Sequence, residues 1–197
     1  MIGILADSHD NLIALRRAVR LFNEAKCSLV IHAGDFVAPF AARELGGLEC
    51  PVKAVFGNCD GEKAGLVKAF QGIGTVAEAP MMFEYGGLNY FVSHLNSFAG
   101  GFFKAGGKMG GECTPSGDQT TGGHVPLARV SGQYYDVVVF GHTHRVDVKR
   151  INGALVINPG EAGGWLCGKS TVALLNDTDL NKTEARPGPI DVEIIAI

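Results

Sequence analysis

The fold of this chain is decided by its first ten residues, where the apolar run Ile2-Gly3-Ile4-Leu5-Ala6 leads directly into Asp7-Ser8-His9-Asp10. A short apolar run bounded by polar residues predicts a buried strand followed by a loop. The residues after this loop predict a helix, because apolar side chains recur at helical spacing at Leu12, Leu15, Val19 and Phe22. Either Asp10 or Asn11 would cap that helix. The N-terminal residues therefore predict a strand, a polar loop and an amphipathic helix in succession.

The same order of a strand and then a polar loop returns twice further along the chain. Residues 28–33 predict a second buried strand that ends at Gly34-Asp35. Residues 52–56 predict a third strand that ends at Gly57-Asn58-Cys59-Asp60, and residues 39–45 between them predict a short helix. Strands that alternate with helices in this way are typical of a parallel α/β sheet.

The second half of the chain is rich in strands and hairpins. Strands are predicted at 81–85, 88–93, 134–140, 146–150, 154–157, 170–175 and 190–197. We therefore expect one α/β domain over residues 1–197, with two sheets packed face to face and helices outside them. A Gly-rich insertion at about 96–133 interrupts the pattern, and such a segment is either a lid over a site or a surface excursion.

The composition limits the class of protein. With 197 residues, of which 46% are hydrophobic and 19% charged, the chain can bury a sizeable core, which excludes a disordered or fibrous protein. The formal net charge of −3 gives no strong signal for nucleic-acid binding. No apolar run approaches the roughly 18 residues of a membrane span, and the first residues lack the basic region of a secretion signal. Five widely spaced cysteines without a CxxC pair favour reduced thiols, so we expect a cytoplasmic protein.

Polar residues follow five of the predicted strands at the point where each strand ends. They are Asp7, His9, Asp35, Asn58, His94, His142 and His144. Since the carboxyl ends of parallel strands form the ligand crevice of an α/β sheet, we expect these side chains to converge. Two buried carboxylates beside four imidazoles are costly without a cation, and this donor set suits Mn, Fe, Zn or Ni. Seven donors are enough for two ions, with one carboxylate that bridges them. Two ions bridged in this way can share a hydroxide, which can attack a phosphorus atom.

These motifs resemble those of a known enzyme family. Asp7-Ser8-His9, Gly34-Asp35, Gly57-Asn58-Cys59-Asp60, His94 and Gly141-His142-Thr143-His144 look like the motif series of the calcineurin-like metallophosphoesterases. From residue 1 to about residue 175 the chain resembles the small single-domain (YfcE-type) phosphodiesterase branch, and Asn158-Pro159-Gly160 is similar to a turn of that branch. The resemblance implies a four-layer α/β/β/α sandwich, made of two mixed sheets with flanking helices, around a dinuclear metal site.

The resemblance also implies a role for each site residue. One ion would be held by Asp7, His9, Asp35 and His144, and the other by Asp35, Asn58, His94 and His142. Asp35 would bridge the two ions, and Asp35, Asn58 and His94 would be the catalytic residues. Asn58 would also contact the phosphate of the substrate. The implied enzyme is a metal-dependent phosphodiesterase that hydrolyses a P–O bond of a small phosphodiester, with Mn²⁺ as the expected ion.

Three features depart from the family pattern, and one of them is Leu95-Asn96 after His94, where relatives usually have Gly and often another His. Cys59 stands where many relatives carry a histidine that assists the leaving group, so that proton must come from elsewhere or matter less. The Gly-rich insertion is longer than expected and follows His94 directly. Within it, His124 would be either a solvent-exposed residue or an acid that reaches the site from a closed lid. Lys104 and Lys108 would be either solvated or in contact with a phosphate.

Two other classes of function are weighed against the enzyme. Gly163–Ser170 matches the P-loop pattern GxxxxGK[ST], but residues 171–175 predict a strand where a P-loop requires a helix. A non-catalytic scaffold of the same fold, as in the retromer complex, would lack metal ligands, whereas all seven are present.

His32 lies inside a predicted strand and is expected to be a hydrogen-bonded core histidine. The last strand, at 190–197, would allow a homo-oligomer if it lies at a sheet edge.

Overall fold

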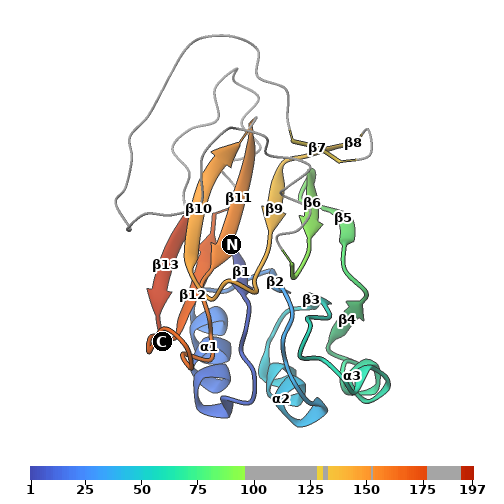
Figure 1. The fold of residues 1–197 in the computed structure, drawn as a ribbon, viewed down its shortest axis with the longest axis vertical. Helices are drawn as coiled ribbons and strands as arrows, with labels where there is room; N and C mark the ends of the chain where they lie inside the picture. Colours follow the sequence, from blue (N-terminus) through green and yellow to red (C-terminus); the bar gives the residue numbers. More distant parts are fainter. Residues whose placement is uncertain (96–127, 131–132, 152, 177–191) are drawn as a thin grey trace.

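The computed structural model of the protein describes residues 1–95, 128–130, 133–151, 153–176 and 192–197. Its strands form two large mixed sheets and one small two-stranded sheet (Figure 1). The first large sheet has the strand order β13-β12-β1-β2-β3-β4. Its strands are β1 (Ile2–Leu5), β2 (Leu29–His32), β3 (Val52–Val55), β4 (Gly74–Ala77), β12 (Thr171–Leu175) and β13 (Val192–Ala196). The strands β1 to β4 are parallel, and β12 and β13 join them in antiparallel pairing.

The second large sheet has the strand order β10-β11-β9-β6-β5. Its strands are β5 (Met81–Tyr85), β6 (Leu88–Val92), β9 (Val137–Val139), β10 (Val146–Ile151) and β11 (Ala154–Pro159). Two antiparallel hairpins, β5–β6 and β10–β11, flank β9, which is parallel to both β6 and β11. The small sheet pairs β7 (Ala128–Val130) with β8 (Gln133–Tyr135).

The described helices lie on one side of the first sheet (Figure 1). They are α1 (Leu12–Glu24), α2 (Pro39–Glu44) and α3 (Lys63–Ala69), with a 3₁₀ turn η1 (Leu45–Gly47) after α2. Asn11 caps α1, since its Oδ1 accepts the backbone N–H of Ala14 at 3.1 Å. Gly3 of β1 allows the helix to approach closely, because a Cβ at Gly3 would lie 2.7 Å from Cδ1 of Phe22.

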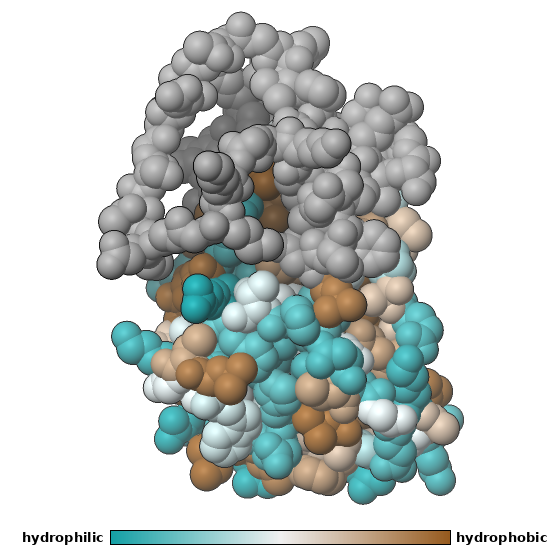
Figure 2. Space-filling view, in the orientation of Figure 1, coloured by the Kyte–Doolittle hydropathy of each residue, from teal (hydrophilic) through white to brown (hydrophobic). Residues whose placement is uncertain are grey.

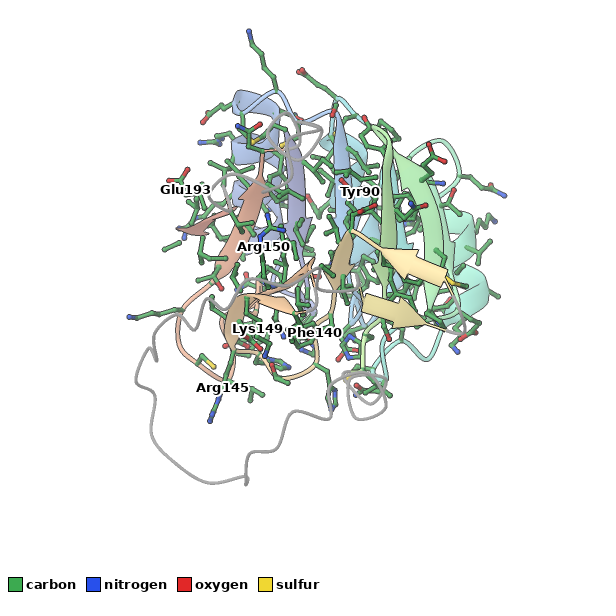
Figure 3. The ribbon with its side chains drawn as sticks, turned by 90° about the horizontal axis from the view of Figure 1, so that it is seen from above. Tyr90, Phe140, Arg145, Lys149, Arg150 and Glu193 are labelled. Atoms are coloured by element: carbon green, nitrogen blue, oxygen red, sulfur yellow. The ribbon has the colours of Figure 1, made fainter. Side chains whose placement is uncertain are left out.

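The central strands β1 and β2 of the first sheet are buried on both faces, which explains their continuous apolar sequences. Toward the helices, Leu5 and Val30 pack with Phe22. On the other face, Ile2, Ile4 and Ile31 pack against Tyr90, Val139 and Ile157 of the second sheet. Figure 3 shows Tyr90 between the blue strands of the first sheet and the green strands of the second. The two sheets are therefore held face to face by one shared apolar core.

The expected α/β class with two mixed sheets and outer helices is confirmed. Among the described residues the helices form a single layer, beside the first sheet, rather than one layer on each side. The predicted strand at 134–140 is wrong as one element, because the chain divides at Asp136. The residues before Asp136 pair with β7, whereas those after it pair with β6.

The helix α3 and the strand β4 were not predicted from the sequence. Both are short, and β4 consists of Gly74-Thr75-Val76-Ala77, which lacks a strong apolar pattern. No helix in the described part of the chain combines the length and apolar character that crossing a membrane requires. On the described surface in Figure 2, hydrophilic residues are interspersed with hydrophobic ones.

Candidate metal centre

All seven residues predicted as metal ligands lie at one end of the two sheets. Asp7, His9, Asp35 and Asn58 follow β1, β2 and β3 of the first sheet, whereas His94, His142 and His144 follow β6 and β9 of the second. Potential ligand atoms of Asp7, Asp35 and His94 all lie within 4.8 Å of one another. The same holds for Asp7, His9 and His144. The convergence expected from the sequence is therefore present in the structure.

Asp7 is the most deeply buried carboxylate of this centre. Its side chain is fully buried, and burial raises its pKa to about 6. The backbone N–H of His142 donates to both of its oxygens, at 3.0 and 3.1 Å. The Nε2 of His144 lies 3.6 Å from Asp7 Oδ1, and the Nε2 of His94 lies 4.0 Å from the same oxygen. A buried carboxylate between two imidazoles favours a bound cation.

Asp35 has the opposite electrostatic character. Burial alone would raise its pKa, but hydrogen bonds from His94 and from the backbone N–H of Cys59 outweigh burial and hold that pKa well below its usual range. The Cys59 N–H lies 2.8 Å from Asp35 Oδ1, and His94 Nε2 lies 3.4 Å from Asp35 Oδ2. Asp35 is thus an ionised carboxylate that lies next to His94 and is held by the loop of Cys59.

The orientation of the His94 ring is fixed by a hydrogen bond on the side away from the metal centre. Its Nδ1 donates to the backbone oxygen of Ala33 at 2.7 Å, so that Nε2 faces the centre. There Nε2 lies 2.9 Å from Oδ1 of Asn58, and Nδ1 of His142 lies 2.8 Å from the same oxygen. Burial disfavours the charged form of His94, but the hydrogen bond and charge of Asp35 raise its pKa overall. Ring nitrogens and oxygens that face one another in this way fit a cation between them.

His144 is oriented by a residue that the sequence did not single out, Glu161. Nδ1 of His144 donates to Oε2 of Glu161 at 2.6 Å, which turns its Nε2 toward Asp7. Glu161 is only 1% exposed, and it also accepts the backbone N–H groups of Leu166 and Cys167. Burial would raise the pKa of Glu161, but these hydrogen bonds lower it. The one sequence signal for Glu161 is its place directly after the turn 158–160.

Asp60 is the second supporting carboxylate, and it holds two ligand loops together. Its Oδ1 accepts the backbone N–H groups of Phe36 and Val37, at 2.7 and 2.8 Å. Its Oδ2 accepts those of Asp35 and Gly57, at 3.0 and 2.7 Å. Asp60 thereby links the loop after β2 to the loop after β3. A sequence signal exists here, since aspartate three residues after Gly57 can close a turn through its side chain.

The backbone of the ligand loops is strained. Left-handed φ angles occur at Asp7 (50°), His9 (47°), Asp35 (64°), His142 (67°) and His144 (59°), all of them ligand candidates. Each such residue costs of order 1–3 kcal/mol, and strain of this kind accumulates at functional sites. The surrounding hydrogen bonds, such as His9 N–H to Asp35 O at 2.9 Å, hold these angles in place.

A groove of about 510 Å³ opens over the ligand cluster. Its lining includes His9, Asp35, Asn58, Cys59, His142, His144, Val37, Asp10, Trp165 and Leu166. Cys59 is the residue at which, by the family resemblance, many relatives would carry a histidine. Burial raises the pKa of the Cys59 thiol to about 11. The Cys59 thiol is therefore a poor proton donor to a leaving group at neutral pH.

The other sequence predictions can also be placed. His32 is fully buried and accepts the Gly34 N–H at Nδ1 (3.1 Å), while its Nε2 donates to Ser8 Oγ (2.9 Å), so it is a core histidine as expected. Gly163–Ser170 leads into the strand β12 rather than into a helix, so the context of a P-loop is not met. The predictions for His124, Lys104 and Lys108 lie outside the described residues.

Comparison with known proteins agrees with this geometry. A model described as the calcineurin-like phosphoesterase superfamily domain matches residues 1–179. A phosphodiesterase of Methanocaldococcus jannaschii is 33% identical over 191 residues, which cover 94% of this chain and 96% of that protein. The solved structure of an archaeal phosphodiesterase superposes with a TM-score of 0.75 at 28% identity, covering 100% of this chain and 99% of that one. The phosphoesterase YfcE of E. coli shares the fold, with a TM-score of 0.56 at 20% identity over 100% of this chain and 98% of its own.

Proposed function

The chain belongs to the calcineurin-like phosphoesterase superfamily, and on that basis we propose that it is a phosphodiesterase that works with two bound divalent ions. Its substrate would be a small phosphodiester, of which one P–O bond is hydrolysed. The single observation that carries this proposal is the cluster of Asp7, Asp35 and His94, whose potential ligand atoms all lie within 4.8 Å of one another. Buried carboxylates at that separation repel each other, and divalent cations offset this repulsion.

The donor set divides into two groups that share Asp35. Asp7, His9, Asp35 and His144 would hold one ion, and Asp35, Asn58, His94 and His142 would hold the other. The lowered pKa of Asp35 supports its role as the bridge, because a bridging ligand must be an ionised carboxylate. A mixed set of imidazole and carboxylate donors fits Mn²⁺, Fe, Zn or Ni, and among these we propose Mn²⁺ on the resemblance to the family.

The ions, when bound, would activate water and neutralise charge at phosphorus. The chain's own residues supply the rest of the chemistry. Glu161 and Ala33 fix the rings of His144 and His94 by accepting their Nδ1 protons. Asn58 Oδ1 faces the two histidines, and its Nδ2 donates to Cys59 Sγ at 3.3 Å, which leaves the second N–H of this amide to donate to a phosphate oxygen. Preorganised donors of this kind need no rearrangement as charge develops in the transition state.

Location, oligomeric state and class of protein are proposed from separate features of the chain. Cys50, Cys59 and Cys167 carry free thiols in the part of the chain that the structure describes, which supports a reducing, cytoplasmic location. The strand β13 lies at an edge of the first sheet, which supports a homo-oligomer formed by edge pairing. The presence of all seven donors in one cluster favours an enzyme over a scaffold of the same fold.

The test is metal removal followed by reconstitution. The protein is treated with EDTA, and hydrolysis of bis-p-nitrophenyl phosphate is followed with and without added Mn²⁺. We expect activity to vanish on stripping and to return with Mn²⁺, and Asp35→Asn to stay inactive in both conditions. Asp10→Asn is the matched control, because this exposed carboxylate lines the same groove. Full activity in EDTA, or an active Asp35→Asn protein, would contradict the proposal.

A further inference from the structure

Two large apolar side chains are exposed at the rim of the groove. Trp165 and Leu166 are 60% and 75% exposed, and both line the same groove as His9, His142 and His144. Apart from Val37, the rest of the lining consists of charged, polar and thiol side chains. Exposed apolar surface beside convergent polar groups is typical of a ligand site.

The loop that carries this rim is fixed to the metal centre. Glu161 accepts the backbone N–H groups of Leu166 and Cys167, and the same carboxylate holds His144. The thiol of Cys167 donates to the backbone oxygen of His144 at 3.2 Å. Glu161 therefore fixes both the position of Trp165 and Leu166 and the orientation of His144, a proposed metal ligand.

Gly163 provides the space in which the indole ring lies. A Cβ at Gly163 would lie 3.1 Å from Cδ1 of Trp165 and 3.0 Å from the backbone oxygens of Asp7 and Ser8. The Asn11 side chain donates to the Gly163 backbone oxygen at 2.7 Å, which ties this glycine to the start of α1. One edge of the indole thus lies beside Gly163, whose N–H donates to the backbone oxygen of Asp7 at 2.9 Å, while Trp165 as a whole stays 60% exposed.

We propose that Trp165, supported by Leu166, is a stacking platform that selects phosphodiesters with an aromatic ring on one ester arm. This proposal rests on the proposed function, since it places the phosphate at the ligand cluster. A groove of about 510 Å³ lies within the roughly 300–1,000 Å³ range of small-molecule sites, so it holds more than the phosphate itself. A flat indole face at its rim matches a planar ring, which gains from stacking in a way that an alkyl chain does not.

The ring has two sources, an aryl group or a nucleobase, and binding experiments separate them. Trp165 is the only tryptophan of the chain, so its fluorescence reports on the platform directly. The Mn²⁺-loaded protein is titrated with phenyl phosphate, with adenosine 5′-monophosphate and with methyl phosphate, which has no ring. We expect saturable fluorescence quenching by at least one of the first two and none by methyl phosphate. Equal quenching by all three ligands, or by none, would overturn the proposal.

Kinetics give a second readout that does not depend on fluorescence. Trp165→Ala should raise KM for bis-p-nitrophenyl phosphate by about 10-fold, which is the usual effect of losing one stacked ring. Its kcat/KM for glycerophosphocholine, a diester without an aromatic ring, should change less than about 2-fold. Trp165→Phe should recover most of the aryl preference. Phe40→Ala is the matched control, because Phe40 is an aromatic residue of α2 that is 50% exposed and does not line the groove.

The outcomes keep this inference separate from the proposed function. If Trp165→Ala lowers kcat/KM equally for both substrates, Trp165 supports the fold and not specificity, and the proposal fails. If the wild-type protein shows no Mn²⁺-dependent diesterase activity, the proposed function fails, while the titration with phenyl phosphate still tests the platform. Bound Mn²⁺ measured in Trp165→Ala should equal that of the wild type, and a loss of metal would also overturn a pure specificity role.

Discussion

Replacing Asp60 with asparagine tests how the loops that carry Asp35 and Asn58 are held. Asp60 is 2% exposed, and each of its two oxygens accepts two backbone N–H groups. Asparagine has the same shape but offers one oxygen and one NH₂ group. Whichever way the amide is turned, its NH₂ faces two N–H donors. Two hydrogen bonds are therefore lost in either orientation, and rotation of the side chain brings no relief.

The size of the effect follows from this count. A hydrogen bond to a charged group contributes about 1.5–3 kcal/mol, so losing two lowers the free energy of unfolding by about 3–6 kcal/mol. That is a large share of the roughly 5–15 kcal/mol that stabilises a domain. For a chain of this length the melting temperature should fall by roughly 6–24 °C. In one orientation of the amide the hydrogen bond to the Asp35 N–H is lost, and in the other the hydrogen bond to the Val37 N–H is lost. Both N–H groups belong to the loop that carries Asp35, so the affinity for Mn²⁺ should fall as well.

The assay is urea unfolding of the metal-free proteins, together with Mn²⁺ titration of the folded ones. Asp10→Asn is the control, since Asp10 is exposed at the same end of the molecule, and it should change stability by less than about 0.5 kcal/mol. If Asp60→Asn unfolds too readily for titration, its lowered midpoint alone supports the reasoning. A free energy of unfolding within about 1 kcal/mol of the wild type would refute it.

Three further predictions follow from the same centre. Glu161→Gln should bind Mn²⁺ about 10–100-fold more weakly while remaining folded, measured by calorimetric titration, and unchanged affinity would count against its orienting role. Gly57→Ala should lose bound metal, because its Cβ would overlap Oδ1 of Asp35, whereas Gly61→Ala has open space and should bind normally when metal content is measured. Burial lowers the pKa of His32 to about 3, below its unfolded value of 6.5, so the unfolded chain binds more protons as the pH falls below 6.5. The metal-free protein should therefore lose stability from about pH 6.5 toward pH 3, by at most about 1.4 kcal/mol per pH unit from this residue. Imidazole ¹⁵N NMR should show His32 neutral at pH 5 in the folded protein, and a protonated ring there would contradict the assignment.

The sequence was sufficient to predict those features that depend on residue type and strand order. Apolar runs that end in Asp, Asn or His predicted the parallel strands and the convergence of the candidate ligands, because a strand end fixes where the next side chain lies. The strand pair 81–85 and 88–93 also agrees with β5 and β6 to within one residue. His32 was identified as a core residue from its place inside an apolar strand.

The pattern of strand ends does not predict which partners the supporting carboxylates bind. Glu161 and Asp60 act through hydrogen bonds to backbone and ring N–H groups, and those depend on where the loops fold. The division of the strand at Asp136 has a similar origin, because the carboxylate of Asp136 accepts the N–H of Asn89 from another strand. A local sequence pattern does not show which residues far apart in the chain will form hydrogen bonds.

The division of the donors between the two sheets has a consequence for the making of the protein. Four of the seven donors precede residue 60, and three come from residue 94 onward, with the supporting Glu161 later still. A ribosome that has translated only the first half has therefore produced neither a complete cage nor a working hydrolase. Hydrolytic competence arises only when the finished polypeptide brings its halves together. Fragments cut between β4 and β5 and produced separately would each be inactive, and activity recovered on mixing would report their association.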